Sequence, residues 1–305
     1  MVFPVFGLVV SGSDDGKSYP KSKIIDAKRL IKDIKYLSSD GLNGRETGTE
    51  GSASARAYII TRFKESGVKP FNGNYLQKFS FSNRKKTRKI NGVNIVGFMK
   101  GKSKPNKYII ITAHYDHLGV KRGKIYNGAD DNASGTAALF GVGKYFKKHN
   151  PEHSLIFAAF DAEEKGLRGA RHFVANLPVK KEDILLNINM DMISRNDKNE
   201  LYVVGTMHYP YLKKYIKPIQ KRAKIKLKFG HEDPKLGRDD WTFSSDHGAF
   251  HRKKIPFLYF GVEDHKDYHK PTDIFENIQP KFYVNAVETI VMAIKEIDEN
   301  YKESI

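Results

Sequence analysis

Five short segments of the 305-residue chain contain side chains that can bind metal ions or transfer protons. They are His114-Tyr115-Asp116, Asp130-Asp131-Asn132, Asp161–Glu164, Asp191 and Asp267–Asp273. Histidine nitrogens and carboxylate oxygens together form ligand sets suited to zinc, manganese or cobalt. Several carboxylates held close together repel one another, and divalent cations remove that repulsion. The segments therefore predict a metal site, provided that the fold brings them together.

The spacing of these residues suggests different tasks for them. In His114-Tyr115-Asp116, the aspartate can orient the histidine ring by accepting its second N–H. Glu163 and Glu164 are adjacent and point in different directions, so that one can bind a metal while the other acts as a general base. Asp191 lies in an apolar run, where a buried carboxylate needs a cationic partner. Each segment alone is also compatible with a turn, a helix cap or a structural hydrogen bond, but five in order favour a functional site.

Predicted strands and helices alternate along the chain as they do in α/β proteins. Apolar runs predict strands over residues 75–81, 92–99, 108–113, 154–160, 184–192 and 256–260. Helices are predicted over residues 26–37, 52–66, 133–147, 209–224 with a break at Pro218, and from Pro280 onward. The predicted fold is one α/β domain with a mixed, mostly parallel central sheet flanked by helices. The five segments fall at the carboxyl ends of strands, which is the ligand-binding edge of such sheets.

Composition excludes several classes of site and partner. The chain contains no cysteine, which excludes disulfides, thiolate metal sites and cysteine nucleophiles. Lys and Arg number 53 against 35 Asp and Glu, a net charge of +18, which favours anionic partners. A basic binding protein with a vestigial metal site is therefore one alternative function. No nucleic-acid module is recognisable, so no specific nucleic-acid partner is predicted, and no run approaches the roughly 20 apolar residues of a membrane span.

Read together, five strings resemble the M28 family of metallopeptidases, which are two-zinc aminopeptidases of the bacterial secreted leucine-aminopeptidase type. The strings are AHYDHLG, NGADDNASGTAAL, FDAEEKGLRGA, NINMDMI and DYHKPTD. The resemblance covers roughly residues 92–300, and the segment from Leu42 to Gly67 is similar to the family's N-terminal helices. It implies a zinc-exopeptidase (phosphorylase/hydrolase-like) domain over residues 23–305, after an N-terminal leader or arm over residues 1–22. No protease-associated domain is expected between residues 67 and 108, because that segment is too short.

The resemblance also implies a role for each residue of the site. The expected ligands are His114 and Asp191 for one Zn²⁺, Asp131 bridging both ions, and Glu164 and His269 for the second Zn²⁺. Glu163 resembles the general base, Asp116 resembles the residue that orients His114, and the Asp131–Asn132 peptide is expected to be cis. Co²⁺ or Mn²⁺ are possible substitutes for zinc.

The implied activity is that of a metal-dependent aminopeptidase, which removes N-terminal residues from peptides with a free N-terminus through water activated by two metal ions. The main alternative is a glutaminyl-cyclase-like acyltransferase, which shares this fold and typically uses one zinc. The complete ligand set favours the aminopeptidase. Residue preference, native metal, oligomeric state and physiological substrate are not specified by the sequence.

The N-terminal segment, the Ser244–His247 segment and two further histidines lie outside the five metal-binding segments. Residues 1–12 are apolar and are interpreted as a signal-peptide remnant or an arm, with Gly12 where a bacterial lipobox has its cysteine. They favour a secreted, periplasmic or envelope-associated protein, with a cytoplasmic one as the alternative. Ser244–His247 lacks the Gly-x-Ser-x-Gly pattern of a serine hydrolase and is predicted to be a helix cap with His247 lining the pocket. His117 and His265 flank ligand segments and are expected to face solvent.

Overall fold

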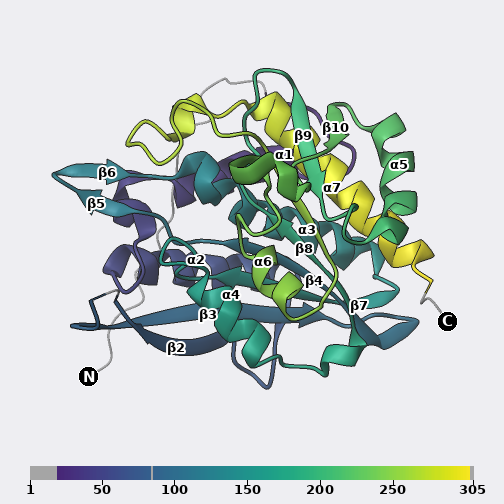
Figure 1. Cartoon of the computed structure of the whole chain (residues 1–305), viewed down its shortest axis with the longest axis horizontal. Coiled ribbons are helices and arrows are strands. Elements are labelled where there is room, and N and C mark those ends of the chain that lie inside the picture. The colour runs from purple at the N-terminus through teal and green to yellow at the C-terminus, as the bar shows by residue number, and fades with distance from the viewer. Residues whose placement is uncertain (1–18, 84, 303–305) are drawn as a thin grey trace.

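A nine-stranded mixed sheet forms the centre of the fold in the computed structural model, which describes residues 19–83 and 85–302 (Figure 1). Its strands are β1 (Lys69–Pro70), β2 (Leu76–Ser82), β3 (Lys89–Met99), β4 (Lys104–His114), β7 (His153–Phe160), β8 (Ile184–Met190), β9 (Glu200–Val204), β10 (Lys226–Phe229) and β11 (Phe257–Gly261). A hairpin of β5 (Gly119–Lys121) and β6 (Lys124–Tyr126) stands apart from it. The α-helices are α1 (Ala27–Leu37), α2 (Glu50–Glu65), α3 (Gly135–His149), α4 (Arg168–Ala175), α5 (Lys213–Arg222), α6 (His247–Arg252) and α7 (Pro280–Asn300).

Four neighbouring strands in the middle of the sheet, in the order β7-β4-β8-β11, run parallel. β3 pairs antiparallel with β7 on one side, and β9 pairs antiparallel with β11 on the other. The predicted mixed, mostly parallel sheet is therefore confirmed. The carboxyl ends of β7, β4, β8 and β11 meet at one edge of the sheet, where ligands of open α/β sheets bind.

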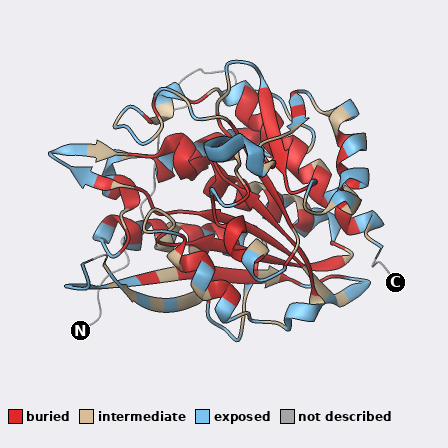
Figure 2. Ribbon diagram, viewed as in Figure 1, coloured by how far each residue is buried: buried red, intermediate tan, exposed pale blue. Residues whose placement is uncertain are grey.

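Helices cover both faces of the sheet, because its central strands are apolar on both sides (Figure 2). On β4, Ile109, Ile111 and Ala113 belong to the larger core, which contains residues of α1, α2, α3, α5 and α7. Ile110 points to the opposite face and belongs to a smaller core with residues of α4 and α6. This alternation along one strand places the two helical layers on opposite sides of the sheet.

A local signal in the sequence accounts for the start of α1, but not for the continuity of α5. Asp26 caps α1, where its side chain accepts a hydrogen bond from the Arg29 backbone N–H at 3.0 Å. The break predicted at Pro218 is wrong, because α5 runs through it from Lys213 to Arg222. A proline inside a short helix removes one hydrogen bond, and the buried side chains of α5 still pack against the core on either side of Pro218.

The described ranges contain no helix that is long and apolar enough to cross a membrane. The apolar segment 1–12 and most of the leader predicted over residues 1–22 lie outside the described residues. A location outside the cytoplasm therefore stays a prediction, which fractionation of the producing cells tests.

Candidate metal centre

Ends of the four parallel strands supply most of the predicted site. β4 ends at His114, β8 is followed by Asp191, and β7 leads through Asp161 to Glu163 and Glu164. The loop after β11 carries His269, and the short helical turn over 129–134, just before α3, carries Asp131. All five predicted ligands thus meet at one edge of the sheet.

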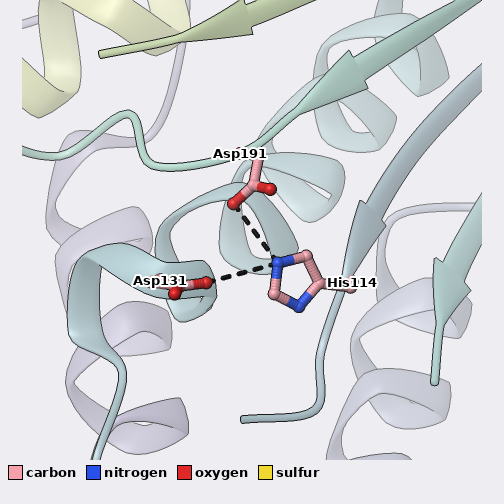
Figure 3. A group of neighbouring side chains, drawn as sticks. All are labelled: His114, Asp131 and Asp191. Carbon is pink, nitrogen blue, oxygen red and sulfur yellow. Dashed lines mark hydrogen bonds and ion pairs between the residues drawn. The ribbon is translucent and has the colours of Figure 1, made fainter. Parts of the chain in front are cut away.

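His114, Asp131 and Asp191 form the first half of the site, and all three are buried (Figure 3). The Nε2 atom of His114 lies 3.3 Å from Oδ1 of Asp131 and 3.3 Å from Oδ1 of Asp191. Figure 3 shows both carboxylates directed at the same ring nitrogen. Three potential ligand atoms therefore surround one small volume.

The second half of the site lies on the other side of the Asp131 carboxylate. Nε2 of His269 is 3.1 Å from Oδ2 of Asp131 and 3.4 Å from Oε2 of Glu164. His117 lies here too, with its Nδ1 2.8 Å from Oε1 of Glu164. Asp131 thus presents one oxygen to each half of the site.

Hydrogen bonds accepted by the carboxylates of Asp273 and Asp130 hold the turn that carries Asp131. The Asp273 carboxylate accepts from the backbone N–H of Asp130 at 3.0 Å and of Asp131 at 3.1 Å. Asp130 in turn accepts from the backbone and the hydroxyl of Ser194 and lies 3.1 Å from Nε2 of His265. The Asp131–Asn132 peptide is cis, as the resemblance implies.

Asp191, the residue after β8, is held by a hydrogen-bond chain that runs from Asn189 of β8 through Ser245. Residues at positions i, i+2 and i+4 of a strand share a face, which aligns Asn187 and Asn189 with Asp191. Asn189 donates to the hydroxyl of Ser245 at 3.0 Å, and that hydroxyl donates to Oδ2 of Asp191 at 2.6 Å. Ser245 lies far from Asp191 in the sequence, and its role could not be predicted from the motif.

Asp116 orients the two glutamates through their backbone. Its carboxylate accepts hydrogen bonds from the N–H of Glu163 at 3.0 Å and of Glu164 at 3.3 Å. The ring Nδ1 of His114 lies 3.1 Å from the backbone oxygen of Asp116 and 3.7 Å from its carboxylate. The backbone oxygen of Asp116 is therefore the nearer partner of His114, and the Asp116 carboxylate binds the backbone N–H groups of the two glutamates.

Arg45 is a buried cation that the sequence reasoning missed. Its side chain is 1% exposed and donates to four backbone carbonyls, those of Leu37, Tyr115, Asn127 and Gly128. Tyr115 follows His114, and Asn127–Gly128 precede the turn with Asp131, so Arg45 fastens two ligand loops together. Burial lowers the pKa of Arg45 to about 10, which leaves it charged at neutral pH.

Charges in the site favour bound cations. Burial disfavours the charged ring of His114, but the carboxylates of Asp191 and Asp131 outweigh it and raise its pKa well above the usual value. Asp131 and Glu164 likewise overcome burial and raise the pKa of His269 to about 10. Protons on the histidines thus balance the carboxylates in the metal-free chain. Divalent cations can replace these protons, and the N/O donor set fits zinc.

A cavity of about 260 Å³ opens onto the two halves of the site. Its wall includes His114, Asp131, Glu163, Asp191 and His269 together with the aromatic rings of Trp241, Tyr259 and Tyr268. The general-base candidate therefore faces the same space as the proposed ligands. An aromatic wall beside that space can contact an apolar part of a substrate.

Three predictions about flanking residues need correction. His117 is 0% exposed, because the Asp116 carboxylate ties this loop inward to the glutamates. His265 contacts Asp130 and is not simply a solvent-facing neighbour. His247 begins α6 as the first helical residue, but it is buried away from the cavity wall, with Nε2 2.8 Å from the Trp241 carbonyl.

Comparisons with known proteins identify relatives by sequence and solved structures with the same fold. Aminopeptidase YwaD from Bacillus subtilis is 28% identical over 321 residues, which cover 95% of this chain and 67% of YwaD. The chain spans only 38% of a probable zinc metalloprotease from Pyrenophora tritici-repentis, with 27% identity.

Two solved structures share the fold. BSAP, a zinc aminopeptidase from Bacillus subtilis, has a TM-score of 0.74 at 18% identity, over 94% of this chain and 98% of BSAP. Porphyromonas gingivalis glutaminyl cyclase has a TM-score of 0.73 at 14% identity, over 90% of this chain and 99% of the cyclase.

The family comparison covers every proposed ligand. The profile of peptidase family M28 matches residues 94–294, which include all four central parallel strands and the loops that follow them. With its histidines and carboxylates gathered at the edge of this sheet, the chain belongs to peptidase family M28 and is a metallopeptidase.

Proposed function

We propose that this chain is an aminopeptidase that uses two zinc ions to remove N-terminal residues from peptides. The position of the Asp131 carboxylate is the main support for this proposal. Its Oδ1 lies 3.3 Å from Nε2 of His114, and its Oδ2 lies 3.1 Å from Nε2 of His269. One carboxylate oxygen faces each half of the site, as a bridging ligand of two cations requires. YwaD and BSAP, both named as aminopeptidases, support the same activity.

Glu163 would transfer the proton in this reaction. Bound zinc would supply polarisation of the scissile carbonyl and a lowered pKa for water. The Glu163 carboxylate lines the cavity, where it can accept a proton from water and deliver it to the leaving amine. Burial raises the pKa of Glu163 well above its usual value in the absence of bound cations.

Size and lining of the cavity support removal of one terminal residue. Its volume of about 260 Å³ lies below the range of about 300–1,000 Å³ typical of pockets for drug-sized ligands. Asp264 lines the same cavity and provides a further carboxylate near the proposed ions. Carboxylates at this position favour a positively charged group of the substrate, such as a free α-ammonium.

Two measurements on the purified full chain test the proposal. The first compares hydrolysis of an aminoacyl anilide before chelation, after chelation and after return of zinc, and metal analysis counts the ions bound. We expect chelation to abolish activity and about two zinc ions per chain to restore it. The second compares a peptide with its N-acetylated form, which should be cleaved at a small fraction of the rate. Full activity in metal-free protein, or equal rates on both peptides, would contradict the proposal.

A glutaminyl cyclase is the second candidate, because P. gingivalis glutaminyl cyclase has nearly the same TM-score as BSAP. The presence of His114 and Asp191 beside the second half of the site favours two ions and hydrolysis. A peptide with N-terminal glutamine separates the two activities. An aminopeptidase releases free glutamine and shortens the peptide, whereas a cyclase releases ammonia and leaves a peptide of unchanged residue count.

A further inference from the structure

His117 is a buried histidine whose two ring nitrogens make no hydrogen bond within the described part of the chain. Its side chain is 0% exposed, and neither Nδ1 nor Nε2 has a hydrogen-bond partner among the described residues. Buried polar groups nearly always have a hydrogen-bond partner, and one that lacks it is a candidate for binding an ion. The Oε1 atom of Glu164 is buried and makes no hydrogen bond to the described residues either.

Backbone packing fixes the ring of His117 in place. Gly128 has a φ of 55°, and a Cβ atom at this position would lie 2.5 Å from Cγ of His117. The ring therefore rests directly on the backbone of the loop that leads to Asp131. It also meets the ring of His269 edge-on, with centroids 5.9 Å apart. Nδ1 is thereby held beside Glu164 and Asp131.

The geometry around Nδ1 of His117, and not the distance alone, suits a shared cation better than a hydrogen bond. Nδ1 is 2.8 Å from Oε1 of Glu164 and 3.7 Å from Oδ2 of Asp131, and the 2.8 Å contact lacks hydrogen-bond geometry. Zinc binds nitrogen and oxygen at about 2.0–2.2 Å with tetrahedral angles, so that its ligand atoms lie roughly 3.3 Å apart. His117, Asp131 and Glu164 form a group whose potential ligand atoms all lie within 4.8 Å of one another.

We propose that His117 is a sixth metal ligand, which binds the second ion through Nδ1 together with Asp131, Glu164 and His269. The inference rests on the proposed two-metal function. It gives the second ion four protein side chains, whereas the first ion has His114, Asp131 and Asp191. The second ion should therefore be held more tightly and leave last when a chelator is added.

Zinc affinity in matched variants provides the first test. Chelator-competition titrations of the full chain would measure both dissociation constants in wild type, His117→Ala, His269→Ala and His114→Ala. We expect His117→Ala, like His269→Ala, to weaken the second ion by more than about 100-fold, beyond the 10–100-fold typical of losing a hydrogen-bond partner of a ligand. His114→Ala should weaken the first ion instead. Unchanged affinities in His117→Ala would overturn the inference.

A direct view of the bond provides the second test and does not depend on activity. Wild-type protein labelled with [¹⁵N]histidine and loaded with ¹¹³Cd²⁺ should show ¹¹³Cd–¹⁵N couplings from two histidines to one cadmium and from one histidine to the other. The coupling through an Nδ1 atom should disappear in His117→Gln. This variant keeps a polar side chain and replaces the alanine variant if that one folds poorly. Coupling from one histidine to each cadmium would overturn the inference.

The two tests separate this inference from the proposed function. A wild-type chain that binds fewer than two ions and leaves free-amine substrates intact refutes the two-metal aminopeptidase. A chain that binds two ions and cleaves such substrates, but shows no coupling to His117, refutes only the sixth ligand.

Discussion

Replacement of Glu163 by Gln separates the proposed base from the proposed ligand beside it. The glutamine has the same shape, but its amide cannot accept a proton. The backbone N–H of Glu163 is held by Asp116 at 3.0 Å, and within the described part of the chain its carboxylate makes no hydrogen bond that the change would break. The loop should therefore keep its position. Any loss of activity then reports on proton transfer.

General-base catalysis contributes typically about 10²–10⁴-fold to rate. We expect kcat of Glu163→Gln to fall by about that factor, which corresponds to about 2.7–5.5 kcal/mol of activation free energy. KM should change little, because the interaction is required in the transition state rather than in substrate binding. The assay measures kcat and KM on an aminoacyl anilide at saturating zinc, with metal content determined on the same samples.

Glu164→Gln is the matched control, because it changes the adjacent residue in the same way. The carboxylate of Glu164 lies 3.4 Å from Nε2 of His269, and we expect its replacement to weaken the second ion as well as the rate. If Glu163→Gln loses an ion while Glu164→Gln keeps both, the two roles are exchanged. If Glu163→Gln retains nearly full kcat, the proposed mechanism is wrong.

Two further predictions concern stability. Asp33 is 1% exposed and pairs with Arg62 through two contacts of 2.9 Å. Within the described part of the chain, Asp33→Ala should leave this buried cation with the half-exposed Glu65 and the Phe140 ring. We expect urea unfolding to show a loss of about 3–5 kcal/mol, and a loss below 1 kcal/mol would contradict the pairing argument. Burial lowers the pKa of His247 to about 3 in the folded protein. In the unfolded chain a histidine has a pKa of about 6.5. The unfolded state thus binds the extra proton between these values, and stability should fall by about 2 kcal/mol from pH 7 to pH 5 through this residue. In metal-free protein, His247→Gln should lack that part of the pH dependence; identical curves would refute it.

Much of the fold could be predicted because its central strands are continuous apolar runs. The run at Tyr108–Ala113 is buried between two parallel neighbours, as its composition suggests. The short strands β9 and β10 were not predicted. β10 alternates lysine with apolar residues over only four positions, and its pairing with β9 depends on contacts far apart in the sequence.

In the candidate site, too, residues within local sequence patterns could be predicted, whereas residues that reach the site only through the fold could not. The proposed ligands could be identified because each follows a strand or begins a helix within a recognisable string. Ser245 and Arg45 could not, because they act on Asp191 and on the ligand loops only after the chain has folded. His117 lies within the string AHYDHLG, but the sequence did not indicate that its loop turns into the site.

The position of Arg45 affects where a working enzyme of this family can be cut. A fragment starting at residue 69 would retain the whole M28 profile match and every proposed ligand, yet it would lack this guanidinium. The carbonyls of Tyr115 and Asn127 would then lose their donor, and that of Gly128 would keep the N–H of Ala133. At about 1–3 kcal/mol for each unsatisfied buried group, the cost is comparable to the roughly 5–15 kcal/mol that stabilises a whole domain. The N-terminal helices therefore belong to the minimal catalytic unit, and a split-protein design would need both pieces to reassemble around Arg45.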